Sequence, residues 1–504
     1  MKMNWRKAGK TGKARKTRKT ASLFGGLLLL AGFALLEPST VSGAGLSWGA
    51  GLWVDVAPLV ECTNRPASSP GDAISPDDLA WFFARPALLT TGFQIQVGQF
   101  SAVMALELQQ DVGELLLGGA ETNLLVTHDW SNVCLSNNYP SVGFLEGKGK
   151  GWYFSLGRRA ISIGSGEYSL ILSGENPWYD HVLAELSAPL ATGSLTYDFL
   201  AVNVQNRAND GKYFFTHSVR AAFPRWSTGI SEYNLVTGRS LDFQDIGPFL
   251  VYHHLFASGS NVMAQVDFSI QPNDEFRLFG EVLMDDFRLG TEATSSNPNA
   301  FGFHAGLEWA ILPEERSSGP SGASDRQRFF RKDYTVRLGQ KQVEGKLVGS
   351  LEWYWASTYL FRRNASLPNE AYFTRYFLQS QNFGWSIVEP WFAYPLGPDR
   401  MMLSGTLRYQ EKKLVSRFKA TFVVSGAESG EQTYASPYAR NWLGPQKPLT
   451  SSGEAEWSAE YNLTRASLLW SKGVLDVGLS DNNRNAIFGL TLGFVHRCGL
   501  GQLN

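Results

Sequence analysis

The chain has 504 residues, of which 18% are charged and 13% aromatic, with 51 Gly and only 3 Cys. This charged fraction lies below the roughly 25% of an ordinary soluble protein, and three Cys are too few for a disulfide scaffold. The mean hydropathy of −0.17 is too polar for a bundle of membrane helices. The composition excludes disordered and collagen-like chains and is typical of an outer-membrane β-barrel.

Residues 1–44 form a predicted export signal. The first twenty residues carry nine Lys or Arg and no acid, and the apolar run Leu23–Leu36 follows. Ser42 and Ala44 then supply the small residues that precede a cleavage site after Ala44. A permanent anchor helix is the alternative, but this apolar run is too short to span about 30 Å of hydrocarbon.

Cleavage would change the charge balance of the chain. It removes nine basic residues and the single acid Glu37, so the net charge moves from −1 to about −9. Such a mature chain is unsuited to binding nucleic acid. The three cysteines have no metal-type spacing; a disulfide between Cys62 and Cys134 is left open, and no zinc site is expected.

Period-two alternation of apolar and polar residues dominates the chain from residue 91 to 504. It is clear in the segments 93–98, 265–271, 403–410, 455–464 and 488–495. Aromatic residues mark the ends of several such segments: Trp152, Tyr153, Tyr354, Trp355, Trp385, Trp391 and Trp470. Because Trp and Tyr favour the lipid headgroup level, we expect an all-β fold, a large antiparallel transmembrane barrel of about 16–20 strands. Two or three soluble β-sandwich domains are the alternative, but no Pro/Ser-rich linker divides the chain.

Polar stretches between these segments predict the surface loops of the barrel. They are Gln205–Lys212, Gly290–Asn299, Pro313–Arg328, Arg362–Glu370 and Gly426–Gly453. The short turns Asn273-Asp274 and Asp481-Asn482-Asn483 are expected at the opposite, periplasmic end.

Residues 45–90 are predicted to form a separate N-terminal periplasmic or plug segment. Ser75-Pro76-Asp77-Asp78 places a cap residue, a first-turn proline and two early acids before the apolar residues 79–84. These are the signals of a helix start whose dipole is complemented by negative charge.

Three stretches resemble one known family. They are Gly157–Pro177, Leu278–Phe287 and Tyr394–Asp399, and in that order they resemble motifs of the Wzi family of outer-membrane capsule-assembly proteins. Ile163, Ser165 and Tyr394 depart from the residues usual in that family. The motif residues expected to be structural are Gly157, Arg158, Gly164, Gly166, Leu172, Ser173, Asn176, Pro177, Glu281, Asp285, Asp286, Pro395, Gly397, Pro398 and Asp399.

The resemblance implies a monomeric barrel of about eighteen strands with a periplasmic helical part, in the outer membrane of a diderm bacterium. It also implies a lectin-like role, in which the protein binds capsular or other surface polysaccharide and assists its assembly or attachment. The implied partners are the polysaccharide, outer-membrane lipid with lipopolysaccharide, and envelope-assembly proteins on the periplasmic side.

Residues that could carry chemistry give little support for an enzyme. His253-His254 and Asp285-Asp286 are adjacent pairs, so in a strand their side chains point to opposite faces. Asp180-His181 lies near Ser169 and Ser173, but no nucleophile elbow is present. We therefore expect no catalytic site, no metal and no cofactor.

Arginine and aromatic residues in the predicted loops are the candidates for glycan binding. They are Arg326, Arg328, Phe329, Arg362, Arg363 and Tyr372. Aromatic faces stack on sugars, and Arg pairs bidentately with uronate carboxylates. The alternative is that these Arg residues pair with neighbouring acids or lipopolysaccharide phosphates. Non-covalent polysaccharide binding is the function that we expect, and a general porin is the alternative.

Overall fold

The computed structural model describes residues 48–66, 72–113, 116, 122–123, 133–135, 140–205, 211–238, 245, 260–286, 298–313, 328, 331–339, 342–380, 384–434, 443–479 and 486–500. Within these ranges, no helix has the length and apolar character to cross a membrane. The export signal predicted for residues 1–44 lies outside the described residues and stays a prediction.

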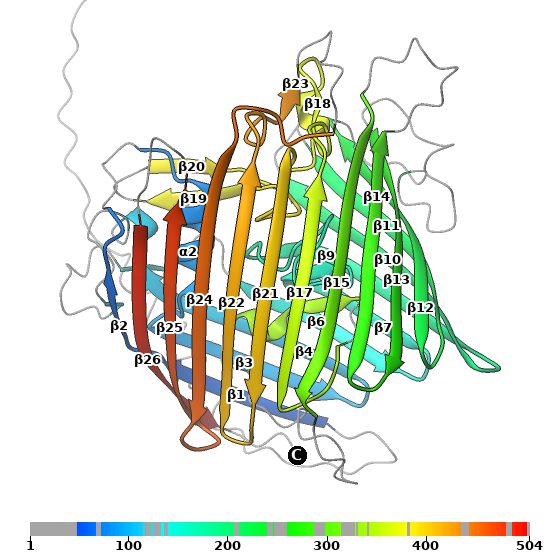
Figure 1. Cartoon of the computed structure of the whole chain (residues 1–504). Helices are drawn as coiled ribbons and strands as arrows, with labels where there is room; N and C mark the ends of the chain where they lie inside the picture. The colour runs from blue at the N-terminus through cyan, green and yellow to red at the C-terminus, as the bar shows by residue number, and fades with distance from the viewer. Residues whose placement is uncertain are drawn as a thin grey trace, which may run out of the picture.

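The described strands form a closed antiparallel barrel (Figure 1). Its ring closes where β1 pairs with β26. β2 continues β1 along β26, and β5 continues β6 along β4, so the wall has eighteen strand positions. The predicted barrel and its strand number are thereby confirmed.

The wall strands are β1 (Trp48–Val56), β2 (Leu59–Thr63), β3 (Leu89–Val97), β4 (Phe100–Gln110), β5 (Val133–Leu135), β6 (Val142–Gly149), β7 (Trp152–Arg159), β9 (Tyr179–Leu190), β10 (Gly193–Gln205), β11 (Lys212–Ala222), β12 (Trp226–Thr237), β13 (Ser260–Asn273), β14 (Phe276–Asp286), β15 (Ala300–Leu312), β17 (Leu347–Ala356), β21 (Arg400–Gln410), β22 (Leu414–Ser425), β24 (Thr450–Asn462), β25 (Ser467–Gly478) and β26 (Ala486–Leu500).

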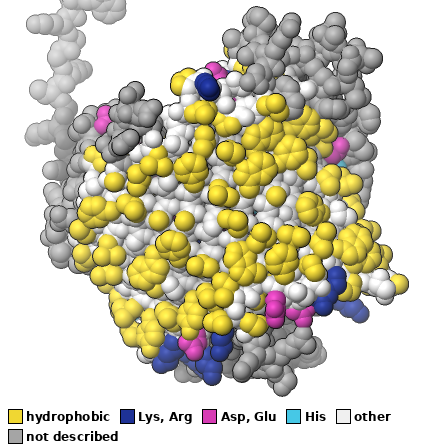
Figure 2. All heavy atoms as spheres, viewed as in Figure 1, with side chains coloured by type: hydrophobic (Ala, Val, Ile, Leu, Met, Phe, Trp, Pro, Cys, Tyr) yellow, Lys and Arg dark blue, Asp and Glu magenta, His cyan; other side chains and the backbone are white. Residues whose placement is uncertain are grey.

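The alternation of side chains is inverted relative to a soluble protein. On β13, Val266 and Phe268 point outward and are 49% and 42% exposed, whereas Asp267 between them points inward and is buried. Figure 2 shows hydrophobic side chains over most of the wall, with charged groups gathered at its lower edge. An apolar exterior around a polar interior is what lipid requires, so the wall is that of a membrane barrel and not of a sandwich.

Most connections at one end of the barrel are short turns, with the β15–β17 connection as an exception, whereas most connections at the other end are long (Figure 1). The end with short turns includes Asn273-Asp274, as expected, and β1 begins and β26 ends there. Short turns are usually periplasmic and long loops extracellular, so the other end, called the loop end below, faces outward. The predicted turn Asp481-Asn482-Asn483 lies outside the described residues.

The N-terminal segment differs from the prediction. Residues 48–63 are not separate from the barrel, because β1 and β2 lie in its wall between β3 and β26. Asp55 of β1 meets Arg497 of β26 with two contacts of 2.5 Å. The predicted boundary at residue 90 therefore does not separate this segment from the barrel. The sequence did not reveal this, because a pair so distant along the chain leaves no local signal.

The predicted helix is confirmed as α2 (Pro76–Ala84), and Ser75 and Asp78 form a reciprocal capping box. Because α2 connects β2 to β3, however, it lies at the loop end and not at the periplasmic end. Its buried Leu79, Phe82 and Phe83 pack in one cluster with Trp178 and residues of β19 (Tyr376–Ser380) and β20 (Gly384–Val388).

The lumen contains chain segments of its own. β8 (Ile161–Ile163) pairs in parallel with β16 (Val336–Leu338), which enters from the connection between β15 and β17. Residues 160–178 are called the plug loop here. The remaining short elements are η4 (Arg331–Tyr334), β18 (Arg363–Asn364), η5 (Pro368–Glu370) and β23 (Thr433–Tyr434).

The plug loop packs against apolar residues of the inner wall. Ile161, Ile171 and Leu172 are fully buried in one cluster with Leu200 of β10 and Phe214 of β11. The interior is therefore apolar on this side of the barrel.

The structure also answers the question of a disulfide between Cys62 and Cys134. Cys62 and Cys498 are free and exposed, so the disulfide between Cys62 and Cys134 is not formed.

Replacing Val266 with Arg tests the direction of the wall. The charge would face the middle of the membrane, and we expect it to reduce the free energy of unfolding by about 2–4 kcal/mol. Glu275→Arg, in the exposed turn after β13, should leave it unchanged. Urea unfolding in lipid vesicles, followed by the heat-modifiable gel band, measures both. Equal stability of the two variants would contradict an outward Val266.

Candidate functional site

Four inward side chains on neighbouring wall strands form a polar cluster. Glu281 of β14 lies opposite His304 of β15, which lies opposite Tyr354 of β17. His304 Nε2 is 3.1 Å from a carboxylate oxygen of Glu352, and its ring stacks on that of Tyr354 at 4.2 Å. All four are buried.

The plug loop donates its backbone to this cluster. The N–H of Ser165 donates to Glu281, that of Glu167 to Glu352 at 2.9 Å, and that of Tyr168 to the Tyr354 oxygen at 3.0 Å. Backbone groups inside a barrel need such partners as much as those inside a soluble core. The wall therefore supplies the acceptors that fix the loop in the lumen.

Arg277 of β14 holds the same loop through its carbonyl side. Its guanidinium donates to the Ser165 carbonyl at 3.0 Å and to Glu308 at 2.8 Å. Glu281 and Arg277 thus bind both backbone groups of Ser165, the N–H and the carbonyl, which belong to two adjacent peptides. Charge-assisted hydrogen bonds of this kind are the stronger ones in proteins.

Two glycines let the loop approach this closely. Gly164 has φ +129°, a value that residues with a side chain rarely adopt. A Cβ on Gly166 would lie 2.3 Å from His304 and 2.4 Å from Glu352. Gly164 and Gly166 of the first motif therefore serve contact between plug and wall.

Ion pairs secure the opposite side of the loop. Glu167 lies 2.5 Å from Arg417 of β22, and Lys419 donates to the Tyr168 hydroxyl at 2.9 Å. The ammonium of Lys332, 2.7 Å away, holds the pKa of Glu175 well below its usual range. Burial raises the pKa of Tyr168 to about 12, so at neutral pH this phenol is uncharged and accepts from Lys419.

The three family-like stretches converge on the plug. Within the first, the amide of Asn176 donates to the carbonyls of Trp391 and Phe392 at 3.2 Å each, just before the third stretch. The buried Asp399 accepts from the Thr358 hydroxyl and from the backbone N–H of Gln446 at 2.9 Å each.

The other motif residues lie along the same path. The backbone N–H of Ser173 donates to the Phe392 carbonyl at 2.8 Å, and Leu172 is fully buried. A Cβ on Gly397 would lie 2.7 Å from the Trp391 ring. Pro177, Pro395 and Pro398 lie within the described stretches, whereas the side chain of Asp286 is not described.

Three of the predicted glycan-binding residues, Arg362, Arg363 and Tyr372, are buried and not exposed in surface loops. Arg362 is 1% exposed and donates to Glu428 at 2.9 Å. Arg363 is buried against Asp285 at 3.2 Å, and the Tyr372 hydroxyl donates to the Asn261 carbonyl at 2.7 Å. These three residues were misplaced because their segment folds into the loop end, where the arginines pair with acids.

The remaining candidates lie elsewhere. Arg328 is exposed in the β15–β17 connection, at the short-turn end, with its guanidinium 5.3 Å from the Tyr334 ring. Arg326 and Phe329 lie outside the described residues, and so do His253 and His254.

The serine–histidine candidates do not assemble as a triad. His181 Nε2 contacts the buried Ser155 hydroxyl at 2.9 Å, but the carboxylate of Asp180 is bound by Arg158 instead. The hydroxyls of Ser169 and Ser173 accept from backbone amides nearby. Among the described residues, no group of His, Cys, Asp or Glu is arranged to hold a metal.

Sequence reasoning missed most of the polar cluster. Glu281 stands in a family-like motif, but Arg277, His304 and Glu352 were not singled out, and Tyr354 was expected among the aromatic residues at the lipid headgroup level, whereas it is buried inside the barrel. The signal available was the i, i+2 spacing of Glu352 and Tyr354 between outward apolar residues, which places both inside the barrel.

Comparisons with known proteins were made at the level of sequence and of structure. No family model matches the chain, and no curated protein matches its sequence. The fold is similar to that of Wzi from Escherichia coli, described as a carbohydrate-binding β-barrel involved in group 1 capsule assembly. The identity is 10% and the TM-score 0.46, over 95% of this chain and 89% of that one. Wzi gives its name to the family that the three motifs resemble.

Other outer-membrane barrels give values of the same order. OccD3 of Pseudomonas aeruginosa matches at 7% identity with a TM-score of 0.43, over 90% of this chain and 91% of that one. OmpT of Vibrio cholerae matches at 8% with a TM-score of 0.36, over 91% and 100%. At these values the similarities assign no function to the chain.

Gly166→Val tests whether the plug depends on this close approach. The side chain would overlap His304 and Glu352, and overpacking of this kind costs about 1–3 kcal/mol. We expect the plug loop to be displaced from the inner wall. The lumen would then be less obstructed, and the conductance of the purified barrel in planar bilayers should rise. Gly430→Val is the control, since no atom lies within 4 Å of its Cβ position. Unchanged conductance of a folded Gly166→Val barrel would contradict the role of the glycine.

Arg363→Ala tests the buried ion pair at the loop end. Asp285 would lose its cation inside the protein, which usually costs about 3–5 kcal/mol. We expect the urea midpoint to fall strongly, whereas Lys412→Ala, in an exposed turn, should not change it. If Arg363→Ala instead kept full stability and lost only glycan binding, Arg363 would be a ligand residue after all.

Proposed function

We propose that this protein is a plugged outer-membrane barrel that binds a surface polysaccharide at its loop end and helps attach it to the cell. The observation that carries the proposal is that Glu281, Glu352 and Arg277 of the wall form hydrogen bonds with the backbone of the plug loop. A lumen occupied in this way favours a role at the outer surface over passage of solutes. The export signal at residues 1–44 is part of the proposal.

A polar patch at the loop end is suited to sugar hydroxyls. Arg375 pairs with Glu389, which also accepts from the Gln432 amide at 3.2 Å. Asn369 accepts from Arg375 at 3.4 Å. These four residues, the loop-end patch, are partly exposed and hold one another in place, so planar donors and acceptors are presented with little freedom to lose on binding.

The mechanism would be multivalent attachment. A repeating polymer presents the same sugars many times, and neighbouring barrels in the membrane present the same patch. Contacts that are weak one at a time then sum to a useful avidity. No covalent step is needed, and we infer a role without catalysis, because the Ser155–His181 pair is buried.

A porin remains the second candidate because one side of the lumen is polar. Glu456 and Lys472, on β24 and β25, face inward and are 19% and 32% exposed, 3.1 Å apart. Planar-bilayer recordings on the wild-type barrel decide between the two: the proposal expects little conductance, and a steady open channel would favour the porin.

Deleting the gene and measuring surface polysaccharide tests the proposal in cells. We expect polysaccharide to move from the cell-bound to the released fraction while the total is unchanged. Wild-type protein should restore the bound fraction, and so should Arg225→Ala, an exposed arginine at the short-turn end. Arg375→Ala with Gln432→Ala should restore much less, because charge-assisted hydrogen bonds contribute about 1.5–3 kcal/mol each. Unchanged cell-bound polysaccharide after deletion would contradict the proposal.

A further inference from the structure

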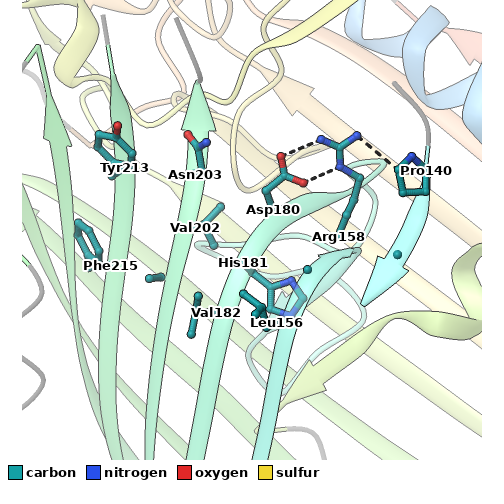
Figure 3. Close-up of a pocket in the computed structure, with 13 residues that line it drawn as sticks. Pro140, Leu156, Arg158, Asp180, His181, Val182, Val202, Asn203, Tyr213 and Phe215 are labelled. Atoms are coloured by element: carbon teal, nitrogen blue, oxygen red, sulfur yellow. Dashed lines mark hydrogen bonds and ion pairs between the residues drawn. The ribbon is translucent and has the colours of Figure 1, made fainter. Parts of the chain in front are cut away.

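The outer wall carries a cavity of about 560 Å³ near the loop end (Figure 3). It is formed on β7, β9, β10 and β11. Leu156 and Val182 of its lining are 44% and 37% exposed, whereas the preceding residues Ser155 and His181 are buried. The alternation therefore places these lining side chains on the membrane face of the barrel and not in the lumen.

Two rows of side chains cross the cavity in strand register. The row nearer the loop end is polar, with Arg158 opposite Asp180, Asp180 opposite Asn203, and Asn203 opposite Tyr213. The row two residues deeper is apolar: Leu156, Val182, Ala201 and Phe215 follow the same pairings. Each of the four strands thus contributes one polar and one apolar residue, in the same order along the membrane normal.

The polar row is nearly balanced in charge. Arg158 and Asp180 are joined by two hydrogen bonds of 2.5 and 2.8 Å, so the row offers no isolated cation. The side-chain oxygen of Asn203 is buried and has no hydrogen-bond partner in the described part of the chain. A mixed set of donors and acceptors with an unused acceptor suits hydroxyl and amide groups better than a bare phosphate.

Small residues give the cavity its depth. Gly143 of β6 and Ala201 of β10 place no large side chain over it, whereas Phe215 packs sideways against Phe199 and Val236. An apolar floor beneath a polar rim matches an amphiphile that stands in the outer leaflet with its head toward the loop end.

We propose that this cavity binds lipopolysaccharide, with one acyl chain on the apolar row and the hydroxyl and amide groups of the acylated sugar at the polar row. The site lies on the wall, apart from the loop-end patch, and does not depend on the polysaccharide role. Bound lipid would fix the position of the barrel in the outer leaflet.

Native mass spectrometry of the delipidated full-length barrel, incubated with purified lipid A, tests the site. Ala201→Trp fills the cavity, and we expect it to retain at least tenfold less lipid A than wild type. Ala459→Trp is the matched control, because Ala459 lies on the outward face of β24 between the exposed Trp457 and Tyr461. Heat-modifiable migration confirms that each barrel is folded.

A second variant keeps the test decisive if Ala201→Trp does not fold. Asn203→Leu with Tyr213→Phe removes polar groups only, and retention of lipid A should fall about tenfold for each hydrogen bond lost. Retention equal to wild type in the folded variants would overturn the site. Equal retention of phosphatidylethanolamine and lipid A by the wild-type barrel would overturn the choice of a sugar lipid.

Discussion

The bonds from the plug loop to Glu281 and Glu352 are the constraint on which the rest of the interior depends. A chain segment that crosses a barrel lumen brings unpaired backbone donors with it, and each costs free energy unless it finds an acceptor. Two wall carboxylates and the Tyr354 oxygen supply those acceptors at three successive points of the loop. Once the loop is held there, glycine is needed at positions 164 and 166, because the loop lies too close to the wall for a side chain. The inward residues of the wall must in turn fit the side chains of the loop.

The plug also explains the pattern of the wall. A water-filled barrel needs polar residues at every inward position, but Leu200, Val202 and Phe214 point inward and are buried against the plug loop. Strands on this side are therefore apolar on both faces, one toward lipid and one toward the plug. On the other side, Arg417 and Lys419 keep the inward face polar, because they pair with Glu167 and Tyr168 of the same loop.

The sequence predicted whatever is encoded locally. Alternation identified the wall, and the Ser75–Asp78 capping box identified α2. Long-range pairing left no such signal: Asp55 meets Arg497, and Arg363 meets Asp285, at separations that no periodicity reveals. A polar, Arg-containing loop looks the same in sequence whether it projects into water or folds over the lumen, so Arg362, Arg363 and Tyr372 were expected in exposed loops, whereas they are buried.

The stretch Gly157-Arg158-Arg159 shows how one motif serves both faces of the wall. Successive residues of a strand point to opposite sides. Arg159 turns inward and donates to the Tyr334 carbonyl at 2.7 Å, beside the plug, whereas Arg158 turns outward and binds Asp180 at the rim of the cavity. A Cβ on Gly157 would lie 2.3 Å from the Gly143 carbonyl oxygen, so the glycine lets β7 lie close to β6 at this point. Because Arg158 and Arg159 are adjacent in one strand, the contact of Arg159 beside the plug also sets the position of Arg158 in the outer polar row.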